Sequence, residues 1–588
     1  MKDKSTKICL KINHKSVEVV QGATILEAAI KARVNIPTLC KHPDLVATGA
    51  CGICVVRVAG RSQLLRACCT PAEDGMDVVT NDPEIIATRR TVLELILSTH
   101  PNECLTCGRN GTCELQQLAE DFGIREKTLP ALVSDVPKDC STGAIVLDSR
   151  KCIKCGRCLT VCQEEQNVWA LTFKNRGLST LMTPAGDISL DDSPCVKCGQ
   201  CSAHCPVGAI YEQDDTGRVW RALSDPGKFC IAQIAPSVRT SLGSAFGYPV
   251  GTNLVGQIYD ALRKIGFKKV FDTNFGADVT VMEEASELVK RLEENEERLP
   301  LITTCCPSWV DYMEKFYSDM IPYFSSCKSP HAILGTLTKT YYAQKMGIDP
   351  SNIVVVSIMP CTSKKYEIRR NEYMAASGYF DVDISITSRE FIRMIKQAGI
   401  IFSELDFLAV ADSPLGDYSG AGTIFGASGG VMEATLRTAH YFMTGTEMPR
   451  MGLKEIQGLE GIKETSISIG SHELKVAVAH GLKNVEFIIE GVKNAIRNKA
   501  PLPYHFIEVM ACPGGCVGGG GQPWPITNEI RIKRAQGLFK DDSMKKNRSS
   551  HENESIKELY KDFLGEPLGP RAMELLHNSY QVRDKYKR

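Results

Sequence analysis

The stretch Cys152-Ile-Lys-Cys-Gly-Arg-Cys-Leu-Thr-Val-Cys162 decides the organisation of this chain, because its spacing, C-x2-C-x2-C-x3-C, occurs twice. The second copy runs from Cys195 to Cys205 and is followed by Pro206. Thiolates at this spacing hold four-iron clusters, and the fourth cysteine of each run crosses to the other cluster. We therefore expect one cluster on Cys152, Cys155, Cys158 and Cys205, and a second on Cys195, Cys198, Cys201 and Cys162.

Composition narrows the class of protein. The chain has 588 residues and 25 cysteines, which are dense before residue 206 and sparse after it. Several domains are expected, because single cores rarely grow past about 250–300 residues. Basic and acidic residues number 69 each, so net charge gives no argument for nucleic-acid or membrane-surface binding. Without an apolar signal core or a membrane-spanning run, we expect a cytoplasmic protein in a reducing compartment and not a secreted disulfide scaffold.

Residues 7–80 alternate in the manner of strands around a helical stretch near residues 24–32, which predicts a small α+β fold. Gly49 and Gly52 allow backbone N–H groups to approach sulfur. Four thiolates in this segment can hold a two-iron cluster, with zinc as the alternative. Because Cys69 follows Cys68 directly, the fourth ligand is ambiguous from spacing. The candidate ligands are Cys40, Cys51, Cys54 and Cys68.

A second candidate site follows, in which one histidine precedes three cysteines with the spacing H-x3-C-x2-C-x5-C. One imidazole and three thiolates suit zinc as well as iron. In an iron cluster, an imidazole in place of a negative thiolate would raise the reduction potential. We expect His42, near Cys40, to be a surface residue. The candidate ligands are His100, Cys104, Cys107 and Cys113.

The C-terminal half has an α/β pattern. Apolar runs at 231–235, 353–359 and 407–410 predict strands, and residues 254–264 and 281–299 predict helices. Three cysteine-bearing turns interrupt this pattern, and the alternative is that they are structural turns with incidental cysteines. Proline and glycine at these turns permit tight bends with exposed N–H groups. The turns are Thr303-Thr-Cys-Cys-Pro-Ser-Trp309, Met359-Pro-Cys-Thr-Ser-Lys-Lys365 and Glu508-Val-Met-Ala-Cys-Pro-Gly-Gly-Cys-Val-Gly-Gly-Gly-Gly-Gln-Pro523.

These three turns resemble the signature segments of the [FeFe] hydrogenases, and the resemblance runs through essentially the whole chain. The N-terminal segments resemble plant-type ferredoxins and, more closely, the large iron-sulfur subunit of respiratory NADH dehydrogenases. The matching N-terminal text is Thr38-Leu-Cys-Lys-His-Pro-Asp-Leu45, Gly49-Ala-Cys-Gly-Ile-Cys54 and Arg66-Ala-Cys-Cys-Thr-Pro71. That pattern favours Cys68 as the fourth ligand, and the position of His100 after such a segment favours a four-iron site.

The resemblance implies a multidomain α+β and α/β protein. A β-grasp 2Fe-2S ferredoxin-like domain would occupy residues 1–82, and a 4Fe-4S domain with one histidine and three cysteine ligands would occupy residues 83–135. A bacterial 2x4Fe-4S ferredoxin-like domain would follow at 136–218, and an α/β domain holding the H-cluster at 219–588. The cofactors would then be one 2Fe-2S cluster, three accessory 4Fe-4S clusters and the H-cluster.

The H-cluster implied by the resemblance is a four-iron cubane joined to a two-iron unit that bears CO, CN and a bridging dithiolate. Carried over by position, its ligands are Cys306, Cys361, Cys512 and Cys516, of which Cys516 bridges the two units. Cys305 matches the residue that passes protons to the bridging amine, since a thiol can donate and accept a proton. Lys364 matches the donor to a cyanide ligand. The pocket residues would be Met359, Met510, Pro236, Ser237, Pro330 and Phe425.

A proton relay is also implied. Glu284 and Glu287 lie three apart on the expected helix, so they face one side of it. They match the relay of the family, with Ser325 between them and Arg291 near the outer end. The alternative is that this acidic pair is only a solvated face of a charge-rich helix.

The function implied is the reversible reduction of two protons to dihydrogen, with electrons relayed from or to ferredoxin. The chain could instead be the hydrogen-activating subunit of an NAD(P)-linked complex. It contains no glycine-rich nucleotide fingerprint, so a flavin or NAD(P) site would belong to a partner subunit. Maturation proteins would supply the two-iron unit. The alternatives are a non-catalytic, hydrogenase-like protein of cluster assembly and an electron-transfer subunit.

Five cysteines have no partners in these motifs. We expect them to be buried apolar residues. They are Cys9, Cys69, Cys140, Cys230 and Cys327.

Overall fold

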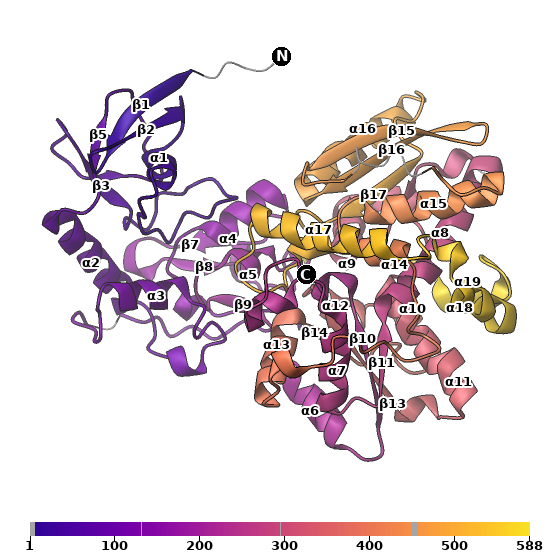
Figure 1. Ribbon diagram of the computed structural model, residues 1–588. Coiled ribbons are helices and arrows are strands. Elements are labelled where there is room, and N and C mark those ends of the chain that lie inside the picture. The colour runs from indigo at the N-terminus through magenta and orange to yellow at the C-terminus, as the bar shows by residue number, and fades with distance from the viewer. Residues whose placement is uncertain (1–5, 131, 295, 450–456, 588) are drawn as a thin grey trace.

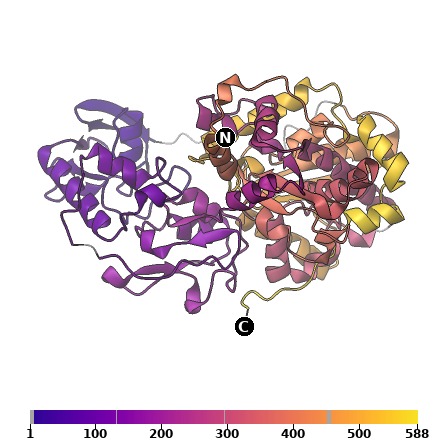
Figure 2. The ribbon, with the colours of Figure 1, turned by 90° about the horizontal axis from the view of Figure 1, so that it is seen from below.

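The computed structural model describes residues 6–130, 132–294, 296–449 and 457–587. Figures 1 and 2 show that the first 200 or so residues form an arm, from indigo to purple, beside the larger C-terminal half. Helix α17 (Asn528–Met544), in yellow, lies where the two parts meet. Within the described ranges, no helix combines the length and hydrophobicity that crossing a bilayer requires.

The N-terminal arm begins with a five-stranded mixed sheet in the order β2-β1-β5-β3-β4. In β1, exposed and buried residues alternate along the whole strand, because successive side chains point to opposite faces. Helix α1 (Ile25–Lys31) starts at Thr24, whose side chain caps it together with Glu27. The predicted strand-helix-strand pattern is therefore observed. The strands are β1 (Lys7–Ile12), β2 (Lys15–Val20), β3 (Val55–Val58), β4 (Leu65–Arg66) and β5 (Asp77–Val79).

Two helices follow the sheet. Helix α2 (Pro83–Ser98) begins with Asp82 as its cap and Pro83 in its first turn, where proline costs no hydrogen bond. Helix α3 (Glu114–Asp121) begins directly after Cys113. The loop between the two helices carries the remaining members of the one-histidine, three-cysteine group.

The repeated cysteine runs form a pseudo-symmetric unit. Each run leads into a short helix, α4 (Arg157–Thr160) or α5 (Gln200–His204), through a left-handed glycine. Strands β6 (Ile145–Leu147) and β9 (Ile210–Glu212) pair as its outer sheet. The long linker between the runs contains a hairpin of β7 (Thr172–Lys174) and β8 (Leu181–Thr183).

The C-terminal half contains two four-stranded sheets. One is wholly parallel in the order β11-β10-β13-β14, and the other is mixed in the order β12-β17-β16-β15. Residues on both faces of β10 and β13 are buried, as is typical of parallel sheets covered by helices. The strands are β10 (Phe229–Ile234), β11 (Lys269–Asp272), β12 (Leu301–Ile302), β13 (Ile353–Met359), β14 (Ile384–Thr387), β15 (Ile462–Ile469), β16 (His472–His480) and β17 (Phe506–Met510).

Helix α8 (Thr273–Glu294) joins the two sheets. Its first half packs with α10 (Pro330–Leu337) on one face of the parallel sheet, and its second half packs with α15 (Gly430–Thr444) against the mixed sheet. The other face of the parallel sheet is covered by α6 (Thr216–Ser224), α7 (Val255–Ile265) and α13 (Ser388–Gln397), as Figure 1 shows. Further helices are α9 (Pro307–Phe316), α11 (Ala343–Met346), α12 (Lys364–Glu367), α14 (Gly420–Ile424), α16 (Leu482–Arg497), α18 (Glu554–Leu559) and α19 (Pro570–Leu576).

Two local predictions were wrong. The helix expected at residues 281–299 runs from Thr273 to Glu294. Its start was missed because its first two turns are buried on all sides and therefore lack an amphipathic period. The strand expected at 407–410 is an irregular segment in which Phe407, Leu408 and Val410 are exposed. Apolar character alone does not distinguish a buried strand from an exposed loop.

Candidate active site and accessory cluster sites

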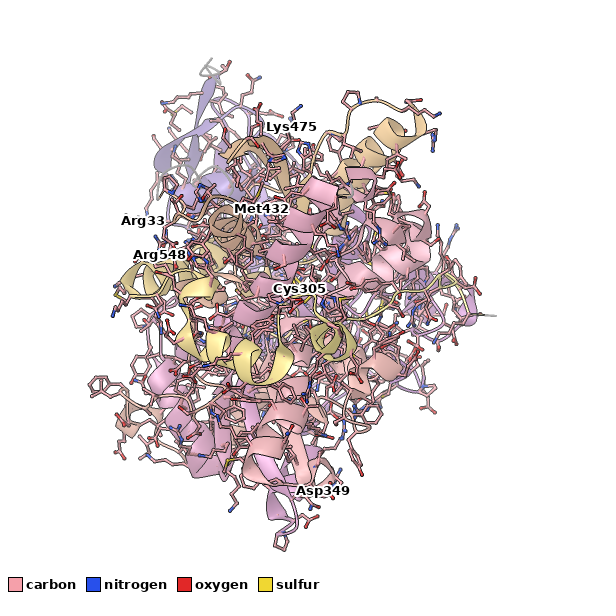
Figure 3. The ribbon with its side chains drawn as sticks, turned by 90° about the vertical axis from the view of Figure 1, so that its right-hand side faces the viewer. Arg33, Cys305, Asp349, Met432, Lys475 and Arg548 are labelled. Atoms are coloured by element: carbon pink, nitrogen blue, oxygen red, sulfur yellow. The ribbon has the colours of Figure 1, made fainter. Side chains whose placement is uncertain are left out.

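The candidate active site is a cavity at the carboxyl ends of strands from both sheets. Such ends are the usual ligand sites of open α/β sheets, because the chain turns away there and leaves a crevice. In the view of Figure 3, Cys305 lies near the middle of the molecule. The cavity is lined after β10 by Pro236 and Ser237, after β12 by Cys305 and Cys306, after β13 by Cys361, and after β17 by Cys512 and Cys516.

Five thiols line the cavity, and all of them come from the three predicted turns. They are enclosed, and burial raises the pKa of Cys361 and of Cys516 to about 12. Such thiols remain protonated unless a metal replaces the proton. Backbone N–H groups at the start of α9 point at Cys306, and those at the start of α12 point at Cys361. Buried thiols with N–H donors suit an anionic iron–sulfur cluster, so the residues fit the cubane of an H-cluster.

The second cysteine run contacts this site directly. Gly199 and Gly520 pack so closely that a Cβ on Gly520 would lie 2.5 Å from the carbonyl oxygen of Cys198. Gln200 Nε2 donates a 3.0 Å hydrogen bond to the carbonyl of Gly518. The glycine-rich end of the third turn is therefore required for close packing, and the second run is the accessory site next to the cavity.

The remaining wall of the cavity is largely apolar. Every pocket residue expected from the sequence lines it, and the structure adds Ala277 from α8 and His331 from α10. The expected residues are Met359, Met510, Pro236, Ser237, Pro330 and Phe425.

Lys364 enters the cavity wall from α12 as part of a buried network. Its Nζ donates to Glu367 Oε2 and Ser329 Oγ, both at 2.7 Å, and to the carbonyl of Cys305 at 3.2 Å. His331 Nε2 lies 2.7 Å from the same Glu367 oxygen. Although burial opposes it, the neighbouring Lys364 and His331 lower the pKa of Glu367 to about 2. Glu367 was missed from the sequence, although its position three residues after Lys364 on a helix was a usable signal.

A buried acidic group lies behind Cys305. Burial and the nearby charge of Glu287 raise the pKa of Glu284 to about 8, although a hydrogen bond from Ser325 opposes this rise. The thiol of Cys305 is enclosed, and burial together with Glu284 raises its pKa well above the usual range. Cys305, Glu284 and Ser325 are thus neighbours in one buried region.

The outer end of this region is held by Arg291. Its guanidinium bonds Glu287 Oε1 at 2.6 Å and donates to the carbonyls of Tyr323 and Phe324. Glu284 and Glu287 each keep one carboxylate oxygen without a hydrogen-bond partner among the described residues. Glu284 is therefore buried and Glu287 half-buried, with 15% of its side chain exposed, so the alternative of a solvated face does not describe Glu284.

The fourth cysteine of each run lies near members of the other run. Cys205 lies in the electrostatic neighbourhood of Cys155 and Cys158, and Cys162 lies in that of Cys201. The backbone N–H of the lysine two residues after the first cysteine of each run donates to that cysteine's sulfur at 3.4 Å, Lys154 in one and Lys197 in the other. Both lysines adopt positive φ, which turns the N–H inward.

The residues of the expected histidine-ligated site lie together. His100, Cys104, Cys107 and Cys113 line one small cavity. Burial lowers the pKa of His100 to about 4, so its ring is neutral. Its Nδ1 is buried without a partner in the described part of the chain, and the ring also bonds the backbone of Lys151. A neutral imidazole with one orphaned nitrogen fits a metal ligand.

In the N-terminal sheet domain, the structure separates the two adjacent cysteines. Cys68 is buried and hydrogen bonds with Cys40 and Cys54, and Cys40 also contacts Cys51. Cys69 is exposed and faces the carbonyl of Arg66. Geometry therefore groups Cys68, and not Cys69, with the other candidate ligands.

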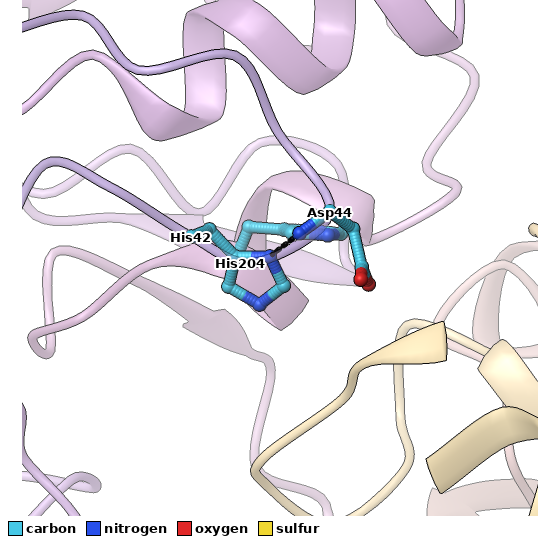
Figure 4. A group of neighbouring side chains, drawn as sticks. All are labelled: His42, Asp44 and His204. Carbon is cyan, nitrogen blue, oxygen red and sulfur yellow. Dashed lines mark hydrogen bonds between the residues drawn. The ribbon is translucent and has the colours of Figure 1, made fainter. Parts of the chain in front are cut away.

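Two expectations need correction, and the first concerns His42. His42 is buried, not at the surface, and its ring lies edge-on to that of His204, with centroids 4.6 Å apart (Figure 4). Asp44 is beside them and could complete a metal site, but its carboxylate accepts hydrogen bonds from Arg531 and the backbone of Asn528. The group therefore acts as a contact between the N-terminal arm and α17.

The second correction concerns the unassigned cysteines. Cys230 and Cys327 are buried, as expected, in the cores around the parallel sheet. Cys9, Cys69 and Cys140 are exposed, so the expectation that they are buried was wrong. A cysteine without a motif can occupy either environment, and the sequence around these three gives no burial signal.

Comparison with known families covers most of the chain. The family described as iron only hydrogenase large subunit, C-terminal domain, matches residues 228–520, and the iron hydrogenase small subunit family matches residues 528–583. Before them, a 2Fe-2S cluster binding domain matches residues 5–83, the NADH-ubiquinone oxidoreductase-G iron-sulfur binding region matches residues 89–128, and a 4Fe-4S dicluster domain matches residues 151–209.

Individual relatives that match most of the chain are also named hydrogenases. The chain is 43% identical to the NADP-reducing hydrogenase subunit HndD of Solidesulfovibrio fructosivorans, across 98% of this chain and 99% of that protein. It is 40% identical to iron hydrogenase 1 of Clostridium pasteurianum, across 97% and 99%. The apo [FeFe]-hydrogenase HydA1 from Chlamydomonas reinhardtii matches with a TM-score of 0.56 at 41% identity, covering 63% of this chain and 100% of that one. Ferredoxin-like iron–sulfur domains thus precede a hydrogenase domain, and the chain belongs to the [FeFe], or iron-only, hydrogenases, oxidoreductases that act on hydrogen.

Proposed function

We propose that this chain catalyses 2H⁺ + 2e⁻ ⇌ H₂ at an H-cluster that Cys306, Cys361, Cys512 and Cys516 would hold. The observation that carries this proposal is the cavity in which four buried thiols from three separate turns meet Cys305 and an apolar wall. When bound, the H-cluster, with its CO, CN and dithiolate ligands, supplies the electrons and the Lewis acidity for hydrogen chemistry.

The protein's own part is to move protons. Cys305 carries a proton between the cavity and Glu284, and Ser325 and Glu287 continue the route outward, with Arg291 holding Glu287 in place near the outer end. Glu284 suits a relay because its pKa of about 8 keeps both of its protonation states accessible near neutral pH. The unpaired carboxylate oxygens of Glu284 and Glu287 leave room for the proton to be accepted and passed on.

The cavity wall orients the cofactor and excludes water. Lys364 would donate to a cyanide ligand in place of its longest present hydrogen bond, the one of 3.2 Å to the carbonyl of Cys305, while Glu367 and Ser329 keep its ammonium group at the wall. The apolar pocket residues keep the site dry, which strengthens every charge interaction inside it. Met359 and Met510, at the ends of strands in the two different sheets, would pack on the two-iron unit.

The accessory clusters form the electron route. One 2Fe-2S cluster is bound by Cys40, Cys51, Cys54 and Cys68, and three 4Fe-4S clusters are bound by the His100 group and the two cysteine runs. The contact between Gly520 and the carbonyl of Cys198 supports the second run as the last step before the H-cluster. The domains proposed for these functions are residues 1–82, 83–135, 136–218 and 219–588.

The electron partner is ferredoxin or a flavin- and NAD(P)-binding subunit. The relative from Solidesulfovibrio fructosivorans is named as a subunit of an NADP-reducing hydrogenase, which supports the second possibility. Because the sequence has no nucleotide fingerprint, the nicotinamide site would lie on the partner. We place the protein in the cytoplasm, where maturation proteins supply the two-iron unit.

The test is infrared spectroscopy of the matured protein together with a hydrogen-evolution assay. Bands of bound CO and CN⁻ and hydrogen production are expected. A protein with iron–sulfur clusters but neither signal would instead be an assembly protein or an electron-transfer subunit. Purification of the native protein would show whether a nucleotide-binding partner co-elutes.

A further inference from the structure

Arg157 is a buried side chain at which three cluster-bearing segments meet. It lies inside the first cysteine run, before Cys158, and is 3% exposed. Its Nη1 and Nη2 donate to the two carboxylate oxygens of Glu114 at 2.7 and 2.8 Å. Its Nη2 also donates to the carbonyl of Lys41 at 2.7 Å. Glu114 follows Cys113 of the histidine-ligated group, and Lys41 follows Cys40 of the two-iron group, so one guanidinium binds both neighbouring modules.

Other contacts show that the two neighbouring modules meet around the first-run site, by which we mean the group of Cys152, Cys155, Cys158 and Cys205. Thr48 Oγ1, from the two-iron domain, donates a 2.8 Å hydrogen bond to the carbonyl of Cys155. The backbone N–H of Glu114 donates to the carbonyl of Pro206 at 3.0 Å. A Cβ on Gly208 would lie 2.4 Å from the sulfur of Cys107, so this glycine permits close approach of the histidine-ligated loop. The cluster of Cys152, Cys155, Cys158 and Cys205 is thus adjacent to both outer sites.

Positive charge is concentrated at this site. Arg157 is in the electrostatic neighbourhood of Cys155 and Cys205, and Arg109 in that of Cys205 and Cys113. Arg109 is buried against Trp524, with its guanidinium carbon 3.9 Å from the ring centroid, and its Nε and Nη1 have no partner among the described residues. The carboxylate that balances Arg157 is Glu114, which is 42% exposed.

The sign of the effect follows from electrostatics. Reduction adds one negative charge to a cluster, so a nearby buried cation stabilises the reduced form and raises the reduction potential. A carboxylate beside that cation opposes the effect. Arginine suits this task because it stays charged when buried and its planar fork binds a carboxylate with two parallel hydrogen bonds.

We propose that Arg157 is a positioning residue that docks the two-iron and histidine-ligated modules on the first-run site and raises the reduction potential of the four-iron cluster there, with Glu114 as its counter-charge. This rests on the cluster assignments of the proposed function. A raised potential makes the first-run cluster the point that collects electrons from both outer clusters.

The test is a redox titration of the whole, cluster-loaded protein followed by electron paramagnetic resonance. A Cys152→Ser variant identifies the first-run signal by its loss or change. Arg157→Gln removes the cation and should shift the midpoint of that signal to a lower potential. Glu114→Gln keeps the cation and removes its counter-charge, so it should shift the same midpoint to a higher potential. Opposite shifts are the signature of charge, because loosened packing would not reverse its sign.

Arg157→Lys separates charge from docking. Its charge should keep the midpoint close to that of the unaltered protein. It cannot form the paired hydrogen bonds to Glu114, so electron entry through the outer clusters should slow several-fold. Shifts in the same direction for Arg157→Gln and Glu114→Gln, or no shift in either, would overturn the proposal. Because Glu114 is partly exposed, the Glu114→Gln variant should fold even if Arg157→Gln does not. Its midpoint shift would then test the proposal. Absence of four-iron signals in the unaltered protein would instead refute the proposed cluster assignments.

Discussion

Lys364 and Glu367 form a buried ion pair at the wall of the active-site cavity, with Nζ and Oε2 2.7 Å apart. They lie one turn apart on α12, so the helix itself sets their spacing. The pair explains how an ammonium group can be kept charged beside a dry, apolar pocket. Glu367 and Ser329 together hold the ammonium group at the cavity wall.

Glu367→Gln should destabilise the protein by about 3–5 kcal/mol, because it leaves the Lys364 cation buried without its counter-charge. The double variant Lys364→Met, Glu367→Met removes both charges and should recover most of that loss while remaining inactive. Thermal unfolding measures the stability of both variants, and hydrogen evolution measures their activity. A double variant less stable than Glu367→Gln would contradict this account of the pair.

Cys305→Ala should lower hydrogen turnover by about 10²–10⁴-fold, the usual contribution of a positioned proton-transfer group. Iron content should stay normal, because Cys305 is not among the proposed ligands. Cys327→Ala is the matched control, since it removes another buried thiol that does not line the cavity. Equal losses in the two variants would assign the effect to packing.

Glu287→Gln should depress turnover with unchanged cluster content, because a neutral amide cannot take up a proton from Glu284 and release it at the outer end of the route. The measurement is the hydrogen-evolution rate per H-cluster, with iron and infrared bands as controls. Full activity in Glu287→Gln would exclude the proposed relay.

The raised pKa of Glu284 also predicts a pH dependence of stability. In the unfolded chain this carboxyl ionises near pH 4.5, whereas in the folded protein it does so near pH 8. Between these values the unfolded state binds fewer protons, so this group lowers stability as pH rises from about 4.5 to 8. Glu284→Gln should flatten that part of the melting-temperature profile. Parallel profiles for the two proteins would show that Glu284 is not buried as an acid.

The adjacent cysteines Cys68 and Cys69 should respond differently to serine substitution. Cys68→Ser should abolish or alter the two-iron signal in the electron paramagnetic resonance spectrum, and Cys69→Ser should leave it unchanged. The reason is that only Cys68 is grouped with the other three candidate ligands. The reverse result would reassign the fourth ligand.

Gly520→Ala should slow electron exchange between the active site and the accessory clusters, because its new Cβ would lie 2.5 Å from the carbonyl of Cys198 and force the modules apart. Stopped-flow reduction of the clusters by hydrogen measures this rate. Gly491→Ala is the control, since it adds a methyl group on a helix with nothing within 4 Å. An unchanged rate in Gly520→Ala would remove the second run from the proposed electron route.

Strongly patterned elements were predictable from the sequence. The run at 353–359 is strand β13 (Ile353–Met359), and the helix expected at 254–264 is α7 within one residue at each end. Both are bounded by clear breaks in pattern. The start of α8 was missed because residues 273–280 are buried on every side, and full burial removes the helical period that marks an element.

By itself, the sequence indicated which cysteines belong together, because ligand spacing within a turn is a local property of the chain. It also indicated Cys305 and Lys364 through their places in those turns. Only the tertiary structure decided that Glu284 is buried with a half-buried Glu287 beside it, and that Glu367 balances Lys364. It also buries Cys68 and exposes Cys69, which agrees with the choice of Cys68 from the sequence. Arg157 likewise contacts residues more than 40 positions away. Such relations depend on which segments the fold brings together, and no local spacing encodes them.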